Sequence, residues 1–181
     1  MKRHLISALA IAALSATTLS TVGCKTASPE ETARREYADS VANNVAKLQL
    51  KYRQFVLTAD QITINHSPII NVSDNTNFIL VDSLTGVVQV SPRFSGGPNS
   101  LGGITVTGDV TNYSMKTAKN GDVTVTYRLS APIGSTDVRI LLYKHSNKAE
   151  ATINATFNRG RATLKGEIKA LGADYFQGRS F

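Results

Sequence analysis

The chain lacks the residues that several common kinds of site require. Its 181 residues include one cysteine and no tryptophan. A single cysteine allows no disulfide within the chain, so the fold must be stable without covalent cross-links. The sequence also has no H-E-x-x-H, C-x-x-C, G-x-S-x-G or Walker-type motif, which excludes the commonest signatures of metal, redox, esterase and nucleotide chemistry. We therefore expect no metal and no cofactor.

Titratable residues that carry catalysis are also few. Beyond the N-terminal segment the chain has two histidines, His66 and His145, and both fall in predicted turns. A catalytic or metal-binding histidine needs a partner that packed neighbours hold in place. Nothing in the sequence pairs these two, which favours surface turn positions. Paired carboxylates for glycoside hydrolysis stay open as an alternative, because they can come from distant strands.

The N-terminal apolar run is too short to cross a bilayer. Lys2 and Arg3 precede an apolar stretch at 5–19, and the small residues 21–23 lead into Cys24. A spanning helix needs about 20 apolar residues. The pattern predicts a lipoprotein signal peptide at 1–23, with Cys24 diacylated as the new N-terminus. A cleaved secretory signal and an uncleaved anchor are the alternatives.

The net charge of the chain is positive, but its basic residues are not grouped. Lysine and arginine total 20 against 13 acidic residues, a formal net charge of +7. They are scattered through separate predicted elements and accompany no aromatic stripe of the kind that binds nucleic acid. We therefore expect no nucleic-acid partner, and a solvated surface near an anionic membrane. The membrane itself is the expected partner of the lipidated Cys24.

A helix is predicted directly after a short tether at 24–28. Ser28 is a suitable N-cap, Pro29 fits the first helical position and Glu31 completes a capping box, so the helix is expected at 29–51. Apolar residues then recur at spacings of four, four and three: Tyr37, Val41, Val45 and Leu48. This apolar stripe indicates an amphipathic helix, and we expect it to pack against the core rather than to bind a partner.

The rest of the chain, 52–181, has the alternation and turn residues of an antiparallel β domain. Asn120-Gly121 is the strongest turn signal and predicts a type I′ hairpin between strands at 111–116 and 123–129. The fold class is therefore mostly β with one N-terminal α-helix. About eight strands are expected to form an antiparallel meander, a curved sheet, or a partly closed barrel or sandwich that packs with the helix.

The segment at 91–103 is the longest stretch without periodicity. It contains two prolines and four glycines, and it carries Arg93 and Phe94. A glycine-rich loop builds little core, whereas an arginine and an aromatic ring can be presented to a partner. We therefore name Arg93 and Phe94 as candidate binding residues. The alternative is that Phe94 and Leu101 pack into the mouth of the barrel.

Residues from about Tyr52 to Lys169 resemble the domain of unknown function 4251 family, a lipoprotein domain of gut Bacteroidota. The resemblance rests on short patterns of glycines and aromatics spread along the chain: 55–59, 87–94, the glycines at 96–97 and 102–103, Gly108 with 112–113, and 160–164 with Gly166. It implies an anchored β domain and an outer-membrane address. It implies no known activity.

Two short motifs have a meaning in that compartment. Asp39-Ser40-Val41 and Asp82-Ser83-Leu84 are similar to the Asp-Ser/Thr-apolar sites that Bacteroidota O-glycosylate in exported proteins. Ser83 falls in a predicted exposed turn and Ser40 lies on the predicted helix. Ser83 is therefore the better candidate for O-glycosylation.

Together these observations predict an uncharacterised lipoprotein of the cell envelope, anchored in the outer membrane and not an enzyme. Its β domain is expected to bind a small ligand or another envelope protein. The alternatives are a purely structural coat protein and a carboxylate-dependent hydrolase that acts on envelope glycans or lipids. A deep apolar cavity favours the small ligand, clustered carboxylates favour hydrolysis, and a flat exposed patch favours a protein partner.

Overall fold

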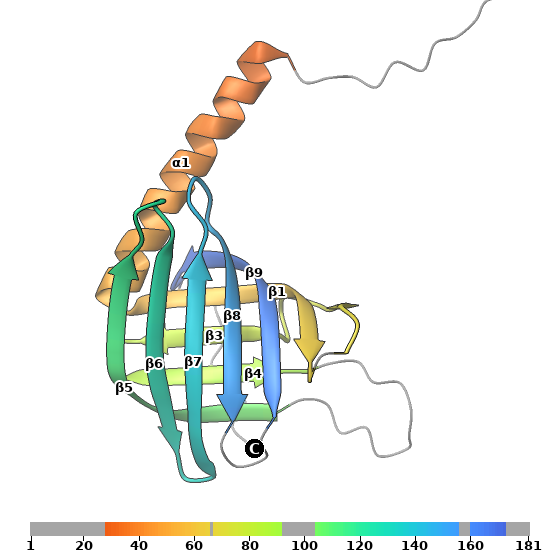
Figure 1. Cartoon of the computed structure of the whole chain (residues 1–181), viewed down its shortest axis with the longest axis vertical. Helices are drawn as coiled ribbons and strands as arrows, with labels where there is room; N and C mark the ends of the chain where they lie inside the picture. Colours follow the sequence, from red (N-terminus) through yellow and green to blue (C-terminus); the bar gives the residue numbers. More distant parts are fainter. Residues whose placement is uncertain (1–27, 66, 92–103, 156–159, 173–181) are drawn as a thin grey trace, which may run out of the picture.

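The structure is a computed structural model that describes residues 28–65, 67–91, 104–155 and 160–172. Within these ranges the chain forms one helix followed by nine strands (Figure 1). Their bounds are α1 (Pro29–Tyr52), β1 (Gln54–Ile64), β2 (Ile70–Asn71), β3 (Phe78–Asp82), β4 (Thr85–Val90), β5 (Ile104–Thr117), β6 (Val123–Ala131), β7 (Gly134–Leu142), β8 (Lys148–Ala155) and β9 (Arg161–Ala170).

Eight of the strands close into an antiparallel barrel. From β3 to β9 each strand pairs with the next one in the chain, β1 pairs with β3, and β9 pairs back with β1 from Phe55↔Ala170 to Ile64↔Ala162. The short β2 pairs only with β1, outside the ring. Of the architectures that the sequence left open, the barrel is the one observed, and closure removes the unpaired edges of the sheet.

Two long strands turn the corners of the barrel. The first half of β1 pairs with β3, and β1 contains a bulge between Ala59 and Gln61. Strand β5 pairs with β4 through its first residues and with β6 through its last ones. Figure 1 shows the result: β3 and β4 cross the direction of β6, β7 and β8. Bulges and bends let one strand belong to both layers.

The core lies inside the barrel and follows from the alternation of the strands. In β6 every second residue is buried, from Val123 to Leu129, while Thr126 and Arg128 are exposed. Strands β7 and β8 repeat the pattern. Complete burial of a valine, leucine or isoleucine contributes about 1.5–3 kcal/mol, so these inward residues dominate the stability.

Helix α1 begins and ends as its sequence predicts. The Ser28 hydroxyl accepts a hydrogen bond from the Glu31 amide at 3.2 Å, and Arg53 ends the helix in the left-handed conformation (φ 57°). Its C-terminal half packs on the barrel through Asn43, Ala46 and Leu50. The Asn43 side-chain amide donates to the carbonyls of Tyr143 (3.0 Å) and Ser146 (2.6 Å) in the β7–β8 turn.

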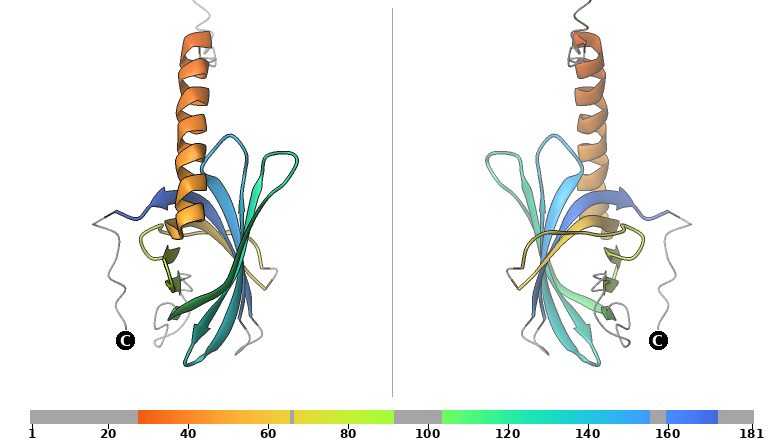
Figure 2. Two further views of the ribbon diagram at one scale, coloured as in Figure 1. Left: turned by 90° about the vertical axis from the view of Figure 1, so that its left-hand side faces the viewer. Right: turned by 90° about the vertical axis from the view of Figure 1, so that its right-hand side faces the viewer.

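The predicted role of the apolar stripe on this helix is wrong. Tyr37, Val41, Val45 and Leu48 are 42–75 % exposed, and so is Tyr52 one turn further. The spacing predicts a core-facing stripe, but the face that packs is the one that carries Asn43, Ala46 and Leu50. This face is held on the barrel by the side-chain amide hydrogen bonds of Asn43 and by the contacts of Ala46 and Leu50, rather than by a wide apolar surface. Figure 2 shows that the N-terminal half of α1 extends beyond the barrel. Within the described residues, no helix combines the length and the apolar character that a bilayer span requires.

The predicted β5–β6 hairpin is confirmed, but its turn type is not. The strands pair from Asp109↔Ser130 to Thr117↔Val123. The Gly121 amide donates to the Ala118 carbonyl at 3.0 Å and Gly121 has φ +94°, whereas Asn120 does not have positive φ. A type I′ turn needs positive φ at both central residues. The connection is therefore a longer turn that ends at a left-handed glycine.

Candidate functional site

The two ends of the barrel differ. At one end Ala46 and Leu50 of α1 join the hydrophobic core, and the Tyr113 hydroxyl donates to the Leu50 carbonyl at 2.5 Å. The Arg53 guanidinium lies 4.7 Å from the centre of the Tyr113 ring. Helix and barrel are thus tied together where β1 begins. The opposite end, where β4 and β8 finish, contains a cavity.

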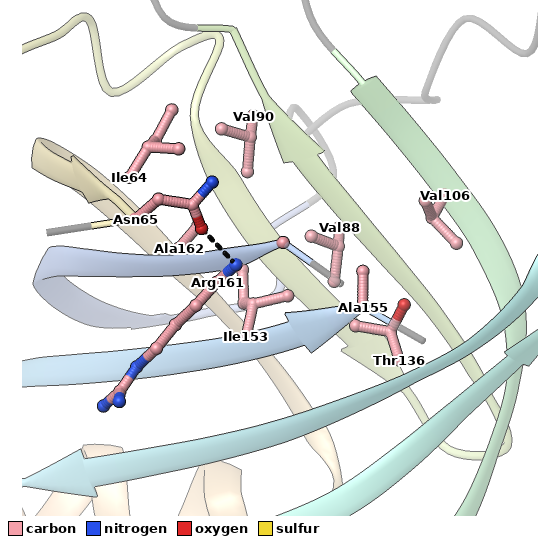
Figure 3. A pocket seen from close by; sticks show the side chains of 11 residues that line it. Ile64, Asn65, Val88, Val90, Val106, Thr136, Ile153, Ala155, Arg161 and Ala162 are labelled. Atoms are coloured by element: carbon pink, nitrogen blue, oxygen red, sulfur yellow. Dashed lines mark hydrogen bonds between the residues drawn. The ribbon is translucent and has the colours of Figure 1, made fainter. Parts of the chain in front are cut away.

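The cavity has a volume of about 150 Å³ and an almost wholly aliphatic lining (Figure 3). Its walls are cross-strand neighbours from six strands, since Val88 pairs with Val106, Thr136 with Ala155, and Ala162 with both Ile64 and Ile153. The complete lining is Ile64, Asn65, Val88, Val90, Val106, Thr136, Ile153, Ala155, Gly160, Arg161 and Ala162. Apolar cavities of roughly 150 Å³ accept a benzene ring.

Small residues create this space. Ala155 ends β8, Ala162 is the second residue of β9 and Gly160 lies between them in the chain. Elsewhere in the barrel, larger side chains such as Leu129, Ile140 and Leu164 fill most of the inward positions, with buried alanines such as Ala151 among them. Packed interiors leave few voids larger than a water molecule. A run of small residues at one end of a closed barrel therefore leaves room for a guest of matching size.

The rim of the cavity is fixed by backbone pairing rather than by side-chain charge. Asn65 adopts φ +45° and exchanges two hydrogen bonds with Arg161: its amide donates to the Arg161 carbonyl (2.9 Å), and its side-chain oxygen accepts from the Arg161 amide (2.8 Å). This pair extends the β1–β9 ladder past Ile64. Figure 3 shows the Arg161 guanidinium directed away from the cavity, so the interior is uncharged.

One polar group in the wall of the cavity has no hydrogen-bond partner within the described part of the chain. Thr136 is only 2 % exposed, and its buried hydroxyl has no hydrogen-bond partner among the described residues. Buried hydroxyls are nearly always hydrogen-bonded, because leaving one without a partner costs roughly 1–3 kcal/mol. A guest that carries one hydrogen-bonding atom would satisfy this group once neighbouring side chains shift, because the oxygen is enclosed in the free protein. The cavity is therefore apolar, with one hydroxyl enclosed in its wall.

We expect Thr136→Val to stabilise the ligand-free protein by about 1 kcal/mol, because the change keeps the shape and removes an unsatisfied buried hydroxyl. The measurement is the urea midpoint of unfolding. Thr152→Val, on the outward face of β8, is the matched control and should change little. A clear loss of stability for Thr136→Val would mean that its hydroxyl is hydrogen-bonded in solution.

A second buried hydroxyl lies deeper in the barrel. Tyr127 is 4 % exposed, and its hydroxyl also has no hydrogen-bond partner among the described residues. Its ring stacks on that of Tyr113 with centroids 5.9 Å apart. Burial raises the pKa of Tyr127 far above its usual range and raises the pKa of Tyr113 to about 12. Both phenols are therefore neutral at physiological pH: Tyr113 packs and donates a hydrogen bond to Leu50, whereas Tyr127 acts through packing.

The residues that line the cavity do not include the side chains that most catalytic sites use. Its lining contains no carboxylate and no histidine. Among the described residues, no group of three or more histidine, cysteine, aspartate or glutamate side chains could hold a metal ion. A threonine becomes a nucleophile only next to a base, and no base hydrogen-bonds to Thr136 within the described part of the chain. The geometry of this cavity suits binding.

The residues predicted from sequence fall in three places. Ser40 lies on the exposed part of α1 and Ser83 lies in the exposed β3–β4 turn with φ +56°, so both are accessible for O-glycosylation. Cys24, Arg93 and Phe94 lie outside the residues that the structure describes. The strands that lead to and from the segment with Arg93 and Phe94, β4 and β5, both contribute to the cavity wall.

Sequence reasoning missed the cavity residues. Thr136, Ala155 and Ala162 lie on different strands, and only the register brings them together. The small residues around Gly160 were a visible signal, but small residues near a turn are common and do not indicate a cavity by themselves.

Comparison with known proteins places the domain in a family. The family described as "Domain of unknown function (DUF4251)" matches residues 38–168 of this chain. The chain belongs to the DUF4251 family. A solved structure, that of a DUF4251 family protein from Bacteroides eggerthii DSM 20697, is 35 % identical with a TM-score of 0.69, and the match covers 81 % of this chain and 99 % of that one. Among curated proteins, none matches this chain.

The DUF4251 match extends into the helix as well as the barrel. It begins at residue 38, within α1, and ends at residue 168, near the end of β9. The packed half of the helix therefore belongs to the domain, in agreement with the contacts of Asn43 and Leu50. The family resemblance that the sequence suggested is confirmed.

Proposed function

We propose that this protein is a non-enzymatic binding protein of the cell envelope whose barrel holds one small, largely apolar ligand. The observation that carries this proposal is the cavity of about 150 Å³, with aliphatic walls and the unsatisfied Thr136 hydroxyl. Its size suits a single ring or a short branched chain. The hydroxyl adds a preference for a ligand with one hydrogen-bonding atom at a fixed place.

The envelope location rests on the N-terminal sequence. Lys2, Arg3, the apolar stretch at 5–19 and the lone Cys24 support a lipoprotein signal, and the family resemblance supports the outer membrane. Several acyl chains on one residue hold a protein firmly in a leaflet, since each buried CH₂ contributes about 0.8 kcal/mol. In this proposal the barrel is an anchored binding module.

Cys24→Ser should abolish lipidation, because the thiol is the acceptor of the acyl chains. Metabolic labelling with palmitate measures this directly, and membrane fractionation should show that the variant keeps its signal peptide or is released. Ser28→Ala, close by in the chain but outside the signal, is the control and should retain full labelling. Palmitate incorporation that persists in Cys24→Ser would contradict the anchor.

Titration with benzene and phenol, followed by the NMR signals of methyl groups in the cavity, tests the binding proposal. Both probes should shift the methyl signals of Val88, Val106 and Ile153 saturably. Phenol should bind about fivefold to tenfold more tightly, since one hydrogen bond contributes about 1 kcal/mol. Thr136→Val should remove this preference while benzene still binds. Shifts that do not saturate with either probe would contradict a binding cavity.

A further inference from the structure

A groove lies on the outer surface of the barrel, over strands β5 to β8, and we call it the outer groove. It has a volume of about 340 Å³, and most of the side chains around it are polar. Small-molecule sites are usually hollows of roughly 300–1,000 Å³ with a few polar groups that fix the orientation of the ligand. The lining residues are Asn112, Thr126, Tyr127, Arg128, Asp137, Val138, Arg139 and Asn154.

The outer groove and the cavity lie on opposite sides of the same barrel wall. Successive residues of a strand point to opposite faces of the sheet. In β7, Thr136 lines the cavity and the next residue, Asp137, lines the groove. In β8, Asn154 lines the groove, whereas its neighbours Ile153 and Ala155 line the cavity. The groove is therefore a separate site, and an inference about it does not depend on the cavity or its ligand.

A bulge in β5 bounds the groove on one side. The β5–β6 register shifts between Thr111 and Ser114. As a result, Asn112 and Tyr113 lie opposite the single residue Tyr127 of β6. Asn112 is exposed and adopts the left-handed conformation, with φ 54°. Bulges bend a strand and redirect its side chains, so the bulge explains why Asn112 joins the lining of the groove.

The centre of the groove carries an ion pair and a second guanidinium. The Arg128 guanidinium donates to both carboxylate oxygens of Asp137, from Nε at 2.8 Å and from Nη2 at 3.2 Å. A two-point pair of this kind fixes the orientation of both groups. Arg139 is exposed, lies two residues further along β7 and has no ion pair among the described residues. The lining thus has two cations and one anion.

The row of outward side chains continues to a third arginine. Asp137 pairs with Asn154 across β7–β8, and Asn154 pairs with Arg161 across β8–β9. Figure 3 shows the Arg161 guanidinium directed away from the cavity. The exposed Asp109 of β5 pairs with Ser130 and is not part of the lining. Arginines that are scattered in the sequence are therefore gathered on one outer face of the barrel.

We infer that the outer groove binds a sugar acid, a ring that carries one carboxylate and several hydroxyls. The Arg139 guanidinium suits the carboxylate, because the fork of an arginine matches two carboxylate oxygens. The Asp137 carboxylate accepts hydrogen bonds from hydroxyls, and the side-chain amides of Asn112 and Asn154 both donate and accept them. The ring is either a free sugar acid or one unit of an acidic glycan, and the chemistry of the contacts is the same.

Other classes of ligand fit the groove less well. A simple anion such as phosphate would use the guanidiniums but would be repelled by the Asp137 carboxylate. A lipid needs an accessible apolar surface, and the apolar members of the lining, Tyr127 and Val138, are buried. An extended peptide commonly adds to a free sheet edge, whereas β6, β7 and β8 are each paired on both sides.

Titration of the full-length chain with galacturonate tests the inference, with the NMR signals of the arginine and asparagine side chains as the readout. Galactose lacks the carboxylate, and acetate lacks the hydroxyls. We expect saturable shifts with galacturonate and at least about tenfold weaker binding of galactose and of acetate, because each lacks one group of contacts. Trigalacturonate that binds more tightly than galacturonate would assign the ligand to a glycan, and equal affinities would assign it to the free sugar acid.

Arg139→Gln should weaken galacturonate binding by about tenfold or more and leave the binding of galactose unchanged, because it removes the partner of the carboxylate. Arg34→Gln, the same change at an exposed position of α1, is the matched control and should bind galacturonate as the parent does. Benzene should still bind to both variants, since the cavity lies on the other side of the wall. This comparison separates a failure of the groove from a failure of the cavity.

Asp137→Ala distinguishes a sugar-acid site from a simple anion site. It should weaken galacturonate binding, because the change removes a hydroxyl acceptor and the group that orients Arg128. The same change should tighten the binding of acetate and phosphate, because a repelling charge is lost. Arg128, Asp137 and Arg139 are all accessible to solvent, so the urea midpoints of the variants should stay close to that of the parent.

Three results would overturn the inference. The first is a galacturonate titration whose shifts do not saturate. The second is phosphate that binds the parent as tightly as galacturonate, with both tightened by Asp137→Ala, which would make the groove a simple anion site. The third is a folded Arg139→Gln protein that binds galacturonate as the parent does, which would place the sugar acid elsewhere.

Discussion

Gly166→Ala is expected to destabilise the protein by about 3 kcal/mol or more, because the neighbouring backbone leaves no space for a side chain at this position. A Cβ on Gly166 would lie 1.9 Å from the carbonyl oxygen of Thr58 and 2.8 Å from the Cα of Ala59. Both atoms belong to the backbone of β1 where it pairs with β9. Relief would require the two strands to separate at the point that closes the barrel.

The control for this prediction is Gly86→Ala. A Cβ on Gly86 would meet the side-chain methyl groups of Val110 at 2.9 Å and Leu129 at 3.0 Å. These atoms are the ends of side chains, which adjust more readily than backbone, so the loss should be smaller. Urea unfolding of both variants gives the comparison. Equal losses, or a Gly166→Ala protein as stable as the parent, would contradict the tight β1–β9 closure.

Ala155→Phe is expected to abolish binding of benzene and phenol while the protein stays folded. Ala155 lies opposite Thr136 in the β7–β8 ladder and lines the cavity. The phenylalanine ring is itself the size of the benzene probe, so it should occupy the space that the probe would take. Because it fills an existing void rather than a packed core, the unfolding free energy should change by about 1 kcal/mol or less.

The matched control is Ala170→Phe, the same change at the exposed end of β9, away from the cavity. It should bind both probes as the parent does. The methyl NMR titration and the urea midpoint are measured on both variants. Undiminished probe binding by a folded Ala155→Phe protein would show that the probes bind elsewhere and would remove the cavity from the functional account.

Local sequence signals predicted the elements well because they act over a few residues. The Ser28 cap, the alternation in 123–129 and the turn residues around 82–86 each specify a local conformation, and the structure confirms the helix, strands and hairpins that they predict. The predicted type I′ turn at Asn120-Gly121 is wrong, because the register of β5 and β6 leaves a longer connection between Thr117 and Val123.

The prediction that the apolar stripe of α1 packs against the core is wrong for a different reason. Periodicity shows that a helix has an apolar face, but it does not show what covers that face. The residues of α1 that pack on the barrel are instead Asn43, Ala46 and Leu50. Asn43 is polar, so apolar spacing does not indicate it. Its amide hydrogen bonds to the β7–β8 turn connect residues about 100 positions apart, a relation that no local pattern contains.

The glycines in the family resemblance now have a physical reason. Gly166 and Gly108 were part of that pattern, and both lie where two backbones approach closely. A Cβ on Gly108 would be 2.1 Å from the Ser130 carbonyl oxygen, near the corner that β5 turns. Both glycines of the family pattern are therefore required where neighbouring strands of the closed barrel come close together. The patterns at 87–94 and 160–164 also include cavity residues, namely Val88, Val90 and 160–162, but the patterns alone do not show that the barrel brings these residues together.

Diffraction from crystals of the protein held under xenon gas tests the central claim most directly, because xenon enters apolar cavities and scatters strongly. The account predicts one well-occupied xenon site bounded by Val88, Val106 and Ile153, and no such site in Ala155→Phe. Ordered water bonded to the Thr136 hydroxyl at this place, with no xenon, would show a wet polar cavity and contradict a binding site for apolar ligands.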